Sequence, residues 1–326
     1  MENHTRYEDF VLLGFLIGHK AEISVAMVLL AIYFLTLSGN ISILIIIATT
    51  TRLHTPMYFF LGNLSVLDLA FSTVTVPIFL RNLLSGIKTI SFAGCMAQSY
   101  CYFFLSTVEY FLLTCMSYDR YVAICNPLRY SAIMNSHVCV QAVLLCWVGG
   151  FFSVLYPTII ITRLSYCKSN IIDHFFCDSE PLLQLSCTDI RLIQLVTFVL
   201  SSVVILSSLA LTVISYLYIV SAILRIPTGA GRKKAFNTCA SHLTLFLMST
   251  AVSILLYVIP SEKSSLGARK IPALLSSIVN PFLIPFIYTL RNDLVKGILG
   301  EIFGQGKAAV AQKMQKLLRM ESAVAF

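Results

Sequence analysis

Seven long apolar segments dominate this sequence. They lie near residues 23–48, 57–80, 96–118, 138–161, 194–224, 243–260 and 271–290. A helix needs about 20 apolar residues to cross the roughly 30 Å hydrocarbon core of a bilayer. The chain is 57% hydrophobic and only 12% charged, whereas soluble domains carry about 25% charged residues. The sequence therefore predicts an all-α membrane protein, a seven-transmembrane helix bundle that occupies residues 23–290.

Lysine and arginine residues in the connections predict the orientation of this bundle. They gather after the first, third and fifth spans and in the tail, which places those segments in the cytoplasm. Residues 1–22 then form an extracellular N-terminus, and residues 291–326 form a cytoplasmic helix and tail. The tail is basic and loosely amphipathic, which favours a short helix on the membrane surface; a solvated tail is the alternative. The polar opening predicts no cleaved signal peptide, and Asn3 starts an N-glycosylation triplet.

The ten cysteines divide by predicted compartment. Six lie in or beside the spans, where small apolar side chains serve packing. Cys95, Cys167, Cys177 and Cys187 lie on the predicted outer side, where disulfides form. Four cysteines allow three pairings, and their spacing does not choose among them. A zinc site is the alternative reading, but no CxxC pair supports it.

Two acidic residues, Asp68 and Glu109, lie near the middle of the second and third spans. An ionised carboxylate within a bilayer costs at least a few kcal/mol, so both are candidates for a functional site. Either they share a sodium ion, with Asn40, Ser65 and Asn280 as neighbouring oxygen ligands, or at least one is protonated and the pair is hydrogen-bonded.

Several short motifs follow one another along the chain. They are Gly39-Asn40, LHTPMYFFL (53–61), LSVLD (64–68), MSYDRYVAIC (116–125), SY (215–216), KAFNTCASHL (234–243) and PFIYTLRN (285–292). A lone DRY triplet at a helix end is explained by a membrane boundary, but this one accompanies the others. In their order and spacing, from about residue 10 to 303, they resemble the odorant receptors of the rhodopsin-like class of G-protein-coupled receptors.

The resemblance implies a receptor and not an enzyme, with no catalytic residues. It would bind small, mostly apolar volatile molecules within the helix bundle, activate a stimulatory (olfactory-type) heterotrimeric G protein and raise cAMP. The implied location is the plasma membrane, in the cilia of olfactory sensory neurons, with membrane lipid around it and no nucleic-acid partner. The resemblance also selects the disulfides Cys95–Cys177 and Cys167–Cys187.

For G-protein coupling and switching, the resemblance indicates Asp119, Arg120, Tyr121, Tyr216, His242, Pro285 and Tyr288. Physically, Asp119 would hold Arg120 in the closed bundle and release it when the bundle opens. Tyr216 and Tyr288 are placed to form hydrogen bonds in the open form. For His242 an ordinary polar packing contact is the alternative.

The odorant pocket is expected between the third, fifth, sixth and seventh spans, beneath the long loop that follows the fourth. Such pockets are mostly apolar with a few fixed polar groups. The expected lining residues are Tyr102, Phe103, Ser106, Thr107, Tyr110, Leu200, Ser201, Val204, Thr250, Ser253, Ile254, Tyr257, Leu274 and Ser277. For each of them helix packing is the alternative. Amine receptors of this class carry an aspartate at the position of Tyr102, so a cationic amine would find no counter-ion on this helix.

Two departures from the family pattern concern the sixth and seventh spans. Ser249-Thr250-Ala251 replaces the usual FYG, which predicts a wider pocket floor or a weaker link to helix movement. Ile284 replaces the usual asparagine between Pro281 and Pro285, two prolines that each free a carbonyl one turn earlier. Asn280, on nearly the same face, is expected to supply the missing amide; a weakened switch is the alternative.

Other classes of protein fit the sequence less well. A transporter or channel predicts polar residues along several spans or an internal repeat, and the sequence has two buried acids and no evident duplication. A membrane enzyme needs a nucleophile and a base within the spans. His242, Cys239 and Ser241 provide such residue types only at the cytoplasmic edge. Within receptors, a chemosensor expressed outside the nose is the alternative.

Overall fold

The structure is a computed structural model of the 326-residue chain, and it describes residues 8–258, 266–291 and 297. The chain divides into two compact units, Met1–Pro285 and Phe286–Phe326, and the description below concerns the first. The predicted glycosylation at Asn3 and the predicted amphipathic helix after the seventh span lie outside the described residues.

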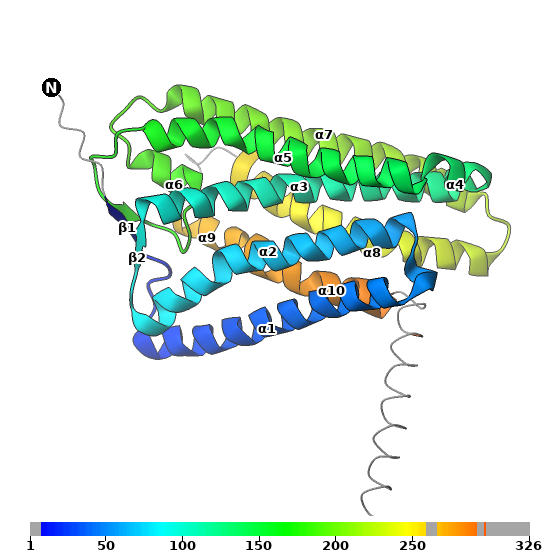
Figure 1. The fold of residues 1–326 in the computed structure, drawn as a ribbon, viewed down its shortest axis with the longest axis horizontal. Coiled ribbons are helices and arrows are strands. Elements are labelled where there is room, and N and C mark those ends of the chain that lie inside the picture. Colours follow the sequence, from blue (N-terminus) through cyan, green and yellow to red (C-terminus); the bar gives the residue numbers. More distant parts are fainter. Residues whose placement is uncertain (1–7, 259–265, 292–296, 298–326) are drawn as a thin grey trace, which may run out of the picture. The chain divides into compact units, whose positions relative to one another are not determined.

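Long helices make up most of the first unit (Figure 1). They are α1 (His19–Thr49), α2 (Pro56–Ser85), α3 (Phe92–Cys125), α5 (Ser136–Arg163), α7 (Arg191–Leu224) and α8 (Gly229–Ser253). Shorter pieces are α4 (Tyr130–Ile133), α6 (Ser179–Gln184), α9 (Leu266–Leu274) and α10 (Asn280–Arg291), with 3-10 turns at Thr51–Leu53 and Pro127–Arg129 and π-helical turns at Ile254–Val258 and Leu275–Val279. Helix α3 is central, because it packs against α2, α5, α7 and α8.

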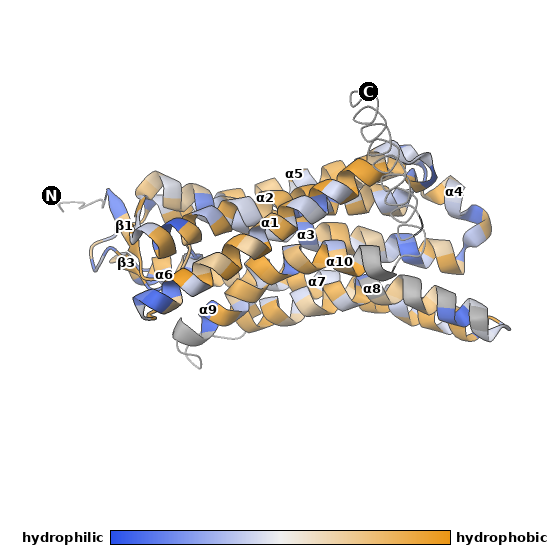
Figure 2. Ribbon diagram, turned by 90° about the horizontal axis from the view of Figure 1, so that it is seen from below, coloured by the Kyte–Doolittle hydropathy of each residue, from blue (hydrophilic) through white to orange (hydrophobic). Residues whose placement is uncertain are grey.

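Five helical segments of the described chain are long and apolar enough to cross a membrane, namely His19–Thr49, Pro56–Ser85, Ser136–Arg163, Arg191–Leu224 and Arg269–Ile287. Figure 2 shows hydrophobic residues along most of the length of these helices. Helix α3 has 34 residues but is more polar, since it contains Gln98, Glu109 and the Asp119–Arg120 pair. The apolar part of the sixth predicted span is shorter, His242–Val258, although its helix begins at Gly229.

Side chains and special backbone positions set the ends of several helices. The Ser91 hydroxyl accepts a hydrogen bond from the Gly94 amide at the start of α3, and the Asn135 side chain caps α5 in the same way. Such caps satisfy amides that have no partner within the helix. Helix α2 has Pro56 in its first turn, and Gly86 caps its C-terminal end with a φ of 66° that glycine readily adopts.

The structure also contains a small sheet of short strands that the sequence analysis did not predict. Strand β1 (Asp9–Leu12) lies between β2 (Thr89–Ser91) and β3 (Ile171–Ile172), antiparallel to the first and parallel to the second. Phe10 and Leu12 point into the protein and are fully buried. Strands this short have no detectable alternation in the sequence, and they pair only because distant loops meet. We call the end of the bundle that carries this sheet the disulfide end.

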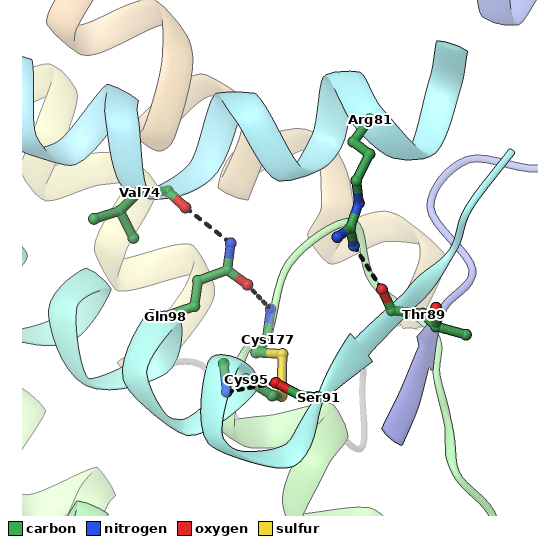
Figure 3. The surroundings of a disulfide bond; sticks show 8 residues. Val74, Arg81, Thr89, Ser91, Cys95, Gln98 and Cys177 are labelled. Atoms are coloured by element: carbon green, nitrogen blue, oxygen red, sulfur yellow. Dashed lines mark hydrogen bonds between the residues drawn. A yellow bond between two sulfur atoms is a disulfide. The ribbon is translucent and has the colours of Figure 1, made fainter. Parts of the chain in front are cut away.

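Two disulfides hold the long loop between α5 and α7 at this end. Cys95 in α3 pairs with Cys177, with Cα atoms 5.4 Å apart, and Cys167 pairs with Cys187 across 5.8 Å. These are the pairings that the resemblance implies. Beside the first bond, Gln98 donates to the Val74 carbonyl (2.9 Å) and accepts from the Cys177 amide (3.1 Å), as Figure 3 shows. One side chain therefore joins α2, α3 and the loop.

Two glycines allow helices to approach closely within the first unit. A Cβ atom at Gly150 would lie 2.5 Å from the Val108 side chain, so α5 packs directly on α3. At Gly39 in α1 it would lie 2.9 Å from Cβ of Pro285. Small residues at such positions let membrane helices pack backbone to backbone.

We expect Gly39→Ala to destabilise the protein by about 1–3 kcal/mol, because the added methyl group overpacks the contact with Pro285. The measurement is the thermal unfolding of the detergent-purified protein. Gly62→Ala in α2 is the matched control, since its Cβ would meet its nearest neighbour at 3.8 Å, an ordinary contact. Equal melting temperatures for the two variants would contradict the prediction.

Candidate functional site

A cavity lies between α3, α5 and α7, towards the disulfide end, and the π-helical turn after α8 closes one side. The volume of this cavity is about 100 Å³. The predicted residues that line it are Phe103, Ser106, Thr107, Tyr110, Leu200, Ser201, Val204, Ser253 and Tyr257. Lining residues that the sequence analysis missed are Ser99, Ser153, Val154, Pro157, Thr158, Ile161, Ser179, Thr197 and Ile205.

Residues of the fourth predicted span, helix α5, therefore line the cavity, whereas the sequence analysis expected residues of the seventh span there. Leu274 and Ser277 are not part of the lining, and the Ser277 hydroxyl donates instead to the Ala273 carbonyl (2.7 Å). Helix α5 reaches the cavity because Gly150 lets it approach α3. The Gly149-Gly150 pair was the signal in the sequence that could have indicated this contact.

Three other expected residues also lie outside the lining. Tyr102 is 1% exposed and its ring stacks on Phe176, with centroids 4.4 Å apart. Thr250 is buried, and Ile254 is half-buried. Thr250 is not among the residues that line this cavity, and the effect of its small size on the pocket floor or on helix movement stays a prediction.

The cavity wall is apolar with scattered hydroxyl groups. The hydroxyls of Thr107, Ser153 and Thr158 each donate to a carbonyl of their own helix, at 2.9 Å. Each such oxygen keeps lone pairs that can accept a hydrogen bond from a ligand. None of the lining residues that the structure describes is Asp, Glu, Lys, Arg or His. The wall itself thus suits a small neutral molecule.

A buried polar network crosses the middle of the bundle. The Ser249 hydroxyl donates to Oε1 of Glu109 (3.1 Å) and accepts from Nδ2 of Asn280 (2.9 Å). The Tyr110 hydroxyl donates to the Ser249 carbonyl (3.0 Å). Asn280 therefore connects α10 to α3 and α8, one turn before Ile284. Ile284 is itself buried, at 2% exposure.

Asn40 in α1 donates a hydrogen bond to the carbonyl that the double-proline segment leaves free. Pro285 has no N–H to bond the Pro281 carbonyl, and that carbonyl accepts instead from Nδ2 of Asn40 (3.2 Å). The same amide nitrogen donates to the Thr36 carbonyl (3.0 Å). Asn40 thus holds α1 against α10 where Gly39 allows close contact.

Three buried oxygen atoms near the second span have no hydrogen-bond partner in the part of the chain that the structure describes. They are Asn40 Oδ1, Ser65 Oγ and Asp68 Oδ2. No group of three or more His, Cys, Asp or Glu side chains among the described residues forms a metal cluster. Amide, hydroxyl and carboxylate oxygens are nevertheless the ligands that hard cations prefer.

At the opposite end of the bundle, Asp119 and Arg120 form an ion pair. The Asp119 side chain is fully buried and that of Arg120 is 13% exposed. Tyr130 in α4, which sequence analysis missed, donates its hydroxyl proton to Oδ1 of Asp119 (2.7 Å). Burial and this hydrogen bond raise the pKa of Tyr130. Asp119 thus joins α3 to the loop that follows it.

His242 forms a second connection near this end. Its Nε2 lies 2.9 Å from the Leu113 carbonyl and its Nδ1 lies 2.9 Å from the Tyr216 hydroxyl. The Tyr216 hydroxyl also donates to the Cys239 carbonyl (3.0 Å). His242 therefore links α3, α7 and α8. Tyr121 packs against the apolar cluster that contains Tyr216, whereas the side chain of Tyr288 lies outside the described residues.

This bundle, with a buried polar centre and an ion pair at one end, has the fold of rhodopsin. The solved structure of squid rhodopsin matches it with a TM-score of 0.64, covering 89% of this chain and 87% of that one at 15% identity. The profile of the olfactory receptor family matches residues 29–306. Human olfactory receptor 6J1 is 54% identical over 311 residues, 95% of this chain and 90% of that protein. Human olfactory receptor 6T1 is 49% identical over 314 residues, 96% and 97% of the two chains.

The chain belongs to the olfactory receptor family. It is therefore a receptor and not an enzyme, and it is a multi-pass membrane protein. Family membership implies odorant detection and signalling through a G protein.

We expect Ser249→Ala to destabilise the protein, because it leaves both Glu109 and Asn280 without this partner. Each buried polar group left unpaired costs about 1–3 kcal/mol. Ser202→Ala is the matched control, since the Ser202 hydroxyl is buried and already has no partner among the described residues. Thermal unfolding of both variants checks this, and a control that loses as much stability as Ser249→Ala would contradict it.

Proposed function

We propose that this receptor binds a small, mostly apolar and neutral odorant in the cavity between α3, α5 and α7. The observation that carries the proposal is the composition of the cavity wall, apolar with hydroxyls and without a charged group among its described residues. Burying about 300 Å² of apolar ligand surface is worth roughly 7 kcal/mol before the costs of association. Micromolar or weaker affinity follows.

The proposed topology has seven spans with the N-terminus outside. Helix α3 rises about 50 Å over its 34 residues, and its polar residues face other helices, so we count it as a span. The apolar segment His242–Val258 completes the count. The two disulfides favour an oxidising, extracellular location for their end, and the arginine and lysine residues favour the cytoplasm for the other.

Signalling is proposed to start with an outward movement of α8 that separates it from α3 and α7. The movement would break the bonds of His242 to Leu113 and Tyr216 and free Arg120 from Asp119. Arg120 would then face the cleft into which a stimulatory, olfactory-type G protein inserts, and cAMP would rise. The same machinery would serve at the plasma membrane of olfactory cilia or in a chemosensory cell elsewhere.

The unpaired oxygens of Asn40, Ser65 and Asp68 support a second proposal, a sodium ion held beside the network of Glu109. The ion would offset carboxylate charge that is costly in the membrane. A protonated Asp68 is the competing arrangement.

The decisive experiment is a cAMP reporter screen of volatile molecules against cells that express this chain. We expect wild-type receptor to respond to a subset of apolar volatiles, and Arg120→Ala to reach the cell surface and lose the response, because the group that contacts the G protein is absent. An undiminished response of Arg120→Ala would remove this residue from the mechanism. Silence towards all volatiles would contradict the proposed function.

Sodium binding is tested by thermal unfolding of purified receptor in sodium chloride and in N-methylglucamine chloride. We expect sodium to raise the melting temperature of wild type and to have no effect on Asp68→Asn, because the variant lacks the carboxylate charge. Asp189→Asn is the control, since Asp189 is 71% exposed and should keep the sodium effect. Equal stability of wild type in both salts would favour the protonated pair.

A further inference from the structure

Two cysteine side chains meet between α3 and α5. The sulfur atoms of Cys115 in α3 and Cys146 in α5 lie 3.7 Å apart, and neither residue belongs to a disulfide. A thiol is a weak donor and a weak acceptor, so one sulfur donates its S–H to the other. Among the free cysteines that the structure describes, no other two sulfurs are hydrogen-bonded to each other.

The helices that carry these thiols are closely packed here. Figure 1 shows α5 lying along α3. A Cβ atom at Gly149, three residues after Cys146, would lie 3.4 Å from the ring of Phe111, one turn before Cys115. The sulfur atoms of a disulfide are about 2.05 Å apart, so closing this pair requires an approach of about 1.7 Å. A change in side-chain rotation with a slight shift of the helices provides this movement.

The thiol of Cys115 is accessible from the lipid. Cys115 is half-buried, whereas Cys146 is 4% exposed. Tyr118, three residues further along the same face of α3, is 48% exposed, and Leu145 beside Cys146 is 70% exposed. An apolar molecule dissolved in the bilayer can therefore approach Cys115. Glutathione, a charged peptide in the aqueous phase, cannot.

The number of ligands argues against a zinc site. Zinc in proteins takes four ligands as a rule, and no third His, Cys, Asp or Glu joins the two sulfurs among the described residues. Two facing thiols are instead the reduced form of a disulfide. Cys115 lies five residues before Arg120, about 7–8 Å along the helix. The proposed topology thus places the pair in the cytoplasmic half of the membrane, and disulfides in reducing compartments are mostly transient and redox-sensing.

We propose that Cys115 and Cys146 form a redox-sensitive dithiol, which an organic hydroperoxide dissolved in the membrane converts into a disulfide that joins α3 to α5. The Cys115 sulfur attacks and breaks the O–O bond, which gives a sulfenic acid, and the alkoxide leaves with the thiol proton as an alcohol. The Cys146 sulfur then attacks the sulfenic sulfur, and the hydroxyl leaves with the second thiol proton as water. Two thiols are oxidised, and one hydroperoxide is reduced to one alcohol and one water.

The new bond would hold two walls of the cavity together, because Thr107 of α3 and Ser153 of α5 both line it. It would also close a loop of chain that contains α4. A disulfide that closes such a loop stabilises a protein mainly by restricting the unfolded chain. We therefore expect oxidation to raise the melting temperature by about 5 °C or more.

The test starts with membranes of cells that express the receptor. They are treated with tert-butyl hydroperoxide, free thiols are blocked with N-ethylmaleimide, and the purified receptor is digested for mass spectrometry and melted. Treated wild type is expected to yield a peptide that links Cys115 to Cys146 and to melt about 5 °C or more above untreated wild type. Cys115→Ala and Cys146→Ala are expected to lose both effects. Cys139→Ala is the matched control, since Cys139 is another buried cysteine of α5, and it is expected to keep both.

Three results would overturn the proposal. They are a treated wild type in which Cys115 and Cys146 remain thiols or become separate sulfinic or sulfonic acids, a link from either residue to a different cysteine, and a linked receptor that melts at the untreated temperature. Should the two alanine variants fail to reach the membrane, wild type and Cys139→Ala decide. No odorant enters these measurements, so the outcome is independent of the proposed function.

Discussion

A polar network in an apolar environment is the constraint on which this bundle depends. Lipid offers no hydrogen bonds, so each buried polar group must find its partner within the protein. Ser249 meets this need for Glu109 and Asn280, and Asn40 meets it for the carbonyl that Pro285 frees. These bonds cross between α1, α3, α8 and α10. They therefore set which faces of the helices meet, a task that apolar side chains surrounded by lipid perform poorly.

The disulfide end shows a different solution. Here the loops are held by covalent bonds, by a small sheet and by Gln98, which bonds both Val74 and Cys177 (Figure 3). The long loop is consequently a fixed cover beside the cavity, and its Ser179 contributes to the lining. The same cover buries Asp178, which is 2% exposed. Rigidity at one end and replaceable side-chain contacts at the other, around Arg120 and His242, suit a protein that receives a ligand on one side and responds on the other.

Much of the architecture could be predicted from local sequence. Apolar runs of membrane length can be read directly from the sequence. Helices α1, α2, α5 and α7 therefore lie where they were expected. Cys95 and Cys177 pair as the family resemblance implied. The strands could not be foreseen, since Asp9–Leu12, Thr89–Ser91 and Ile171–Ile172 are too short for alternation. The lining was predicted only in part, because Gly150 brings α5 to the cavity through a contact with Val108. The Gly149-Gly150 pair indicates a close contact, but the sequence does not say which helix lies against it.

The sequence by itself determined that this chain enters a membrane and which segments become helices, because hydrophobic length is a local quantity. It also determined that two prolines and two acids would lie inside the bilayer. Only the tertiary structure decided what those groups bond to. Asn40 meets Pro281 across 241 residues of chain, and Ser249 meets Glu109 across 140. Such contacts depend on how whole helices pack against one another, and the pattern of residues along one helix does not specify that packing.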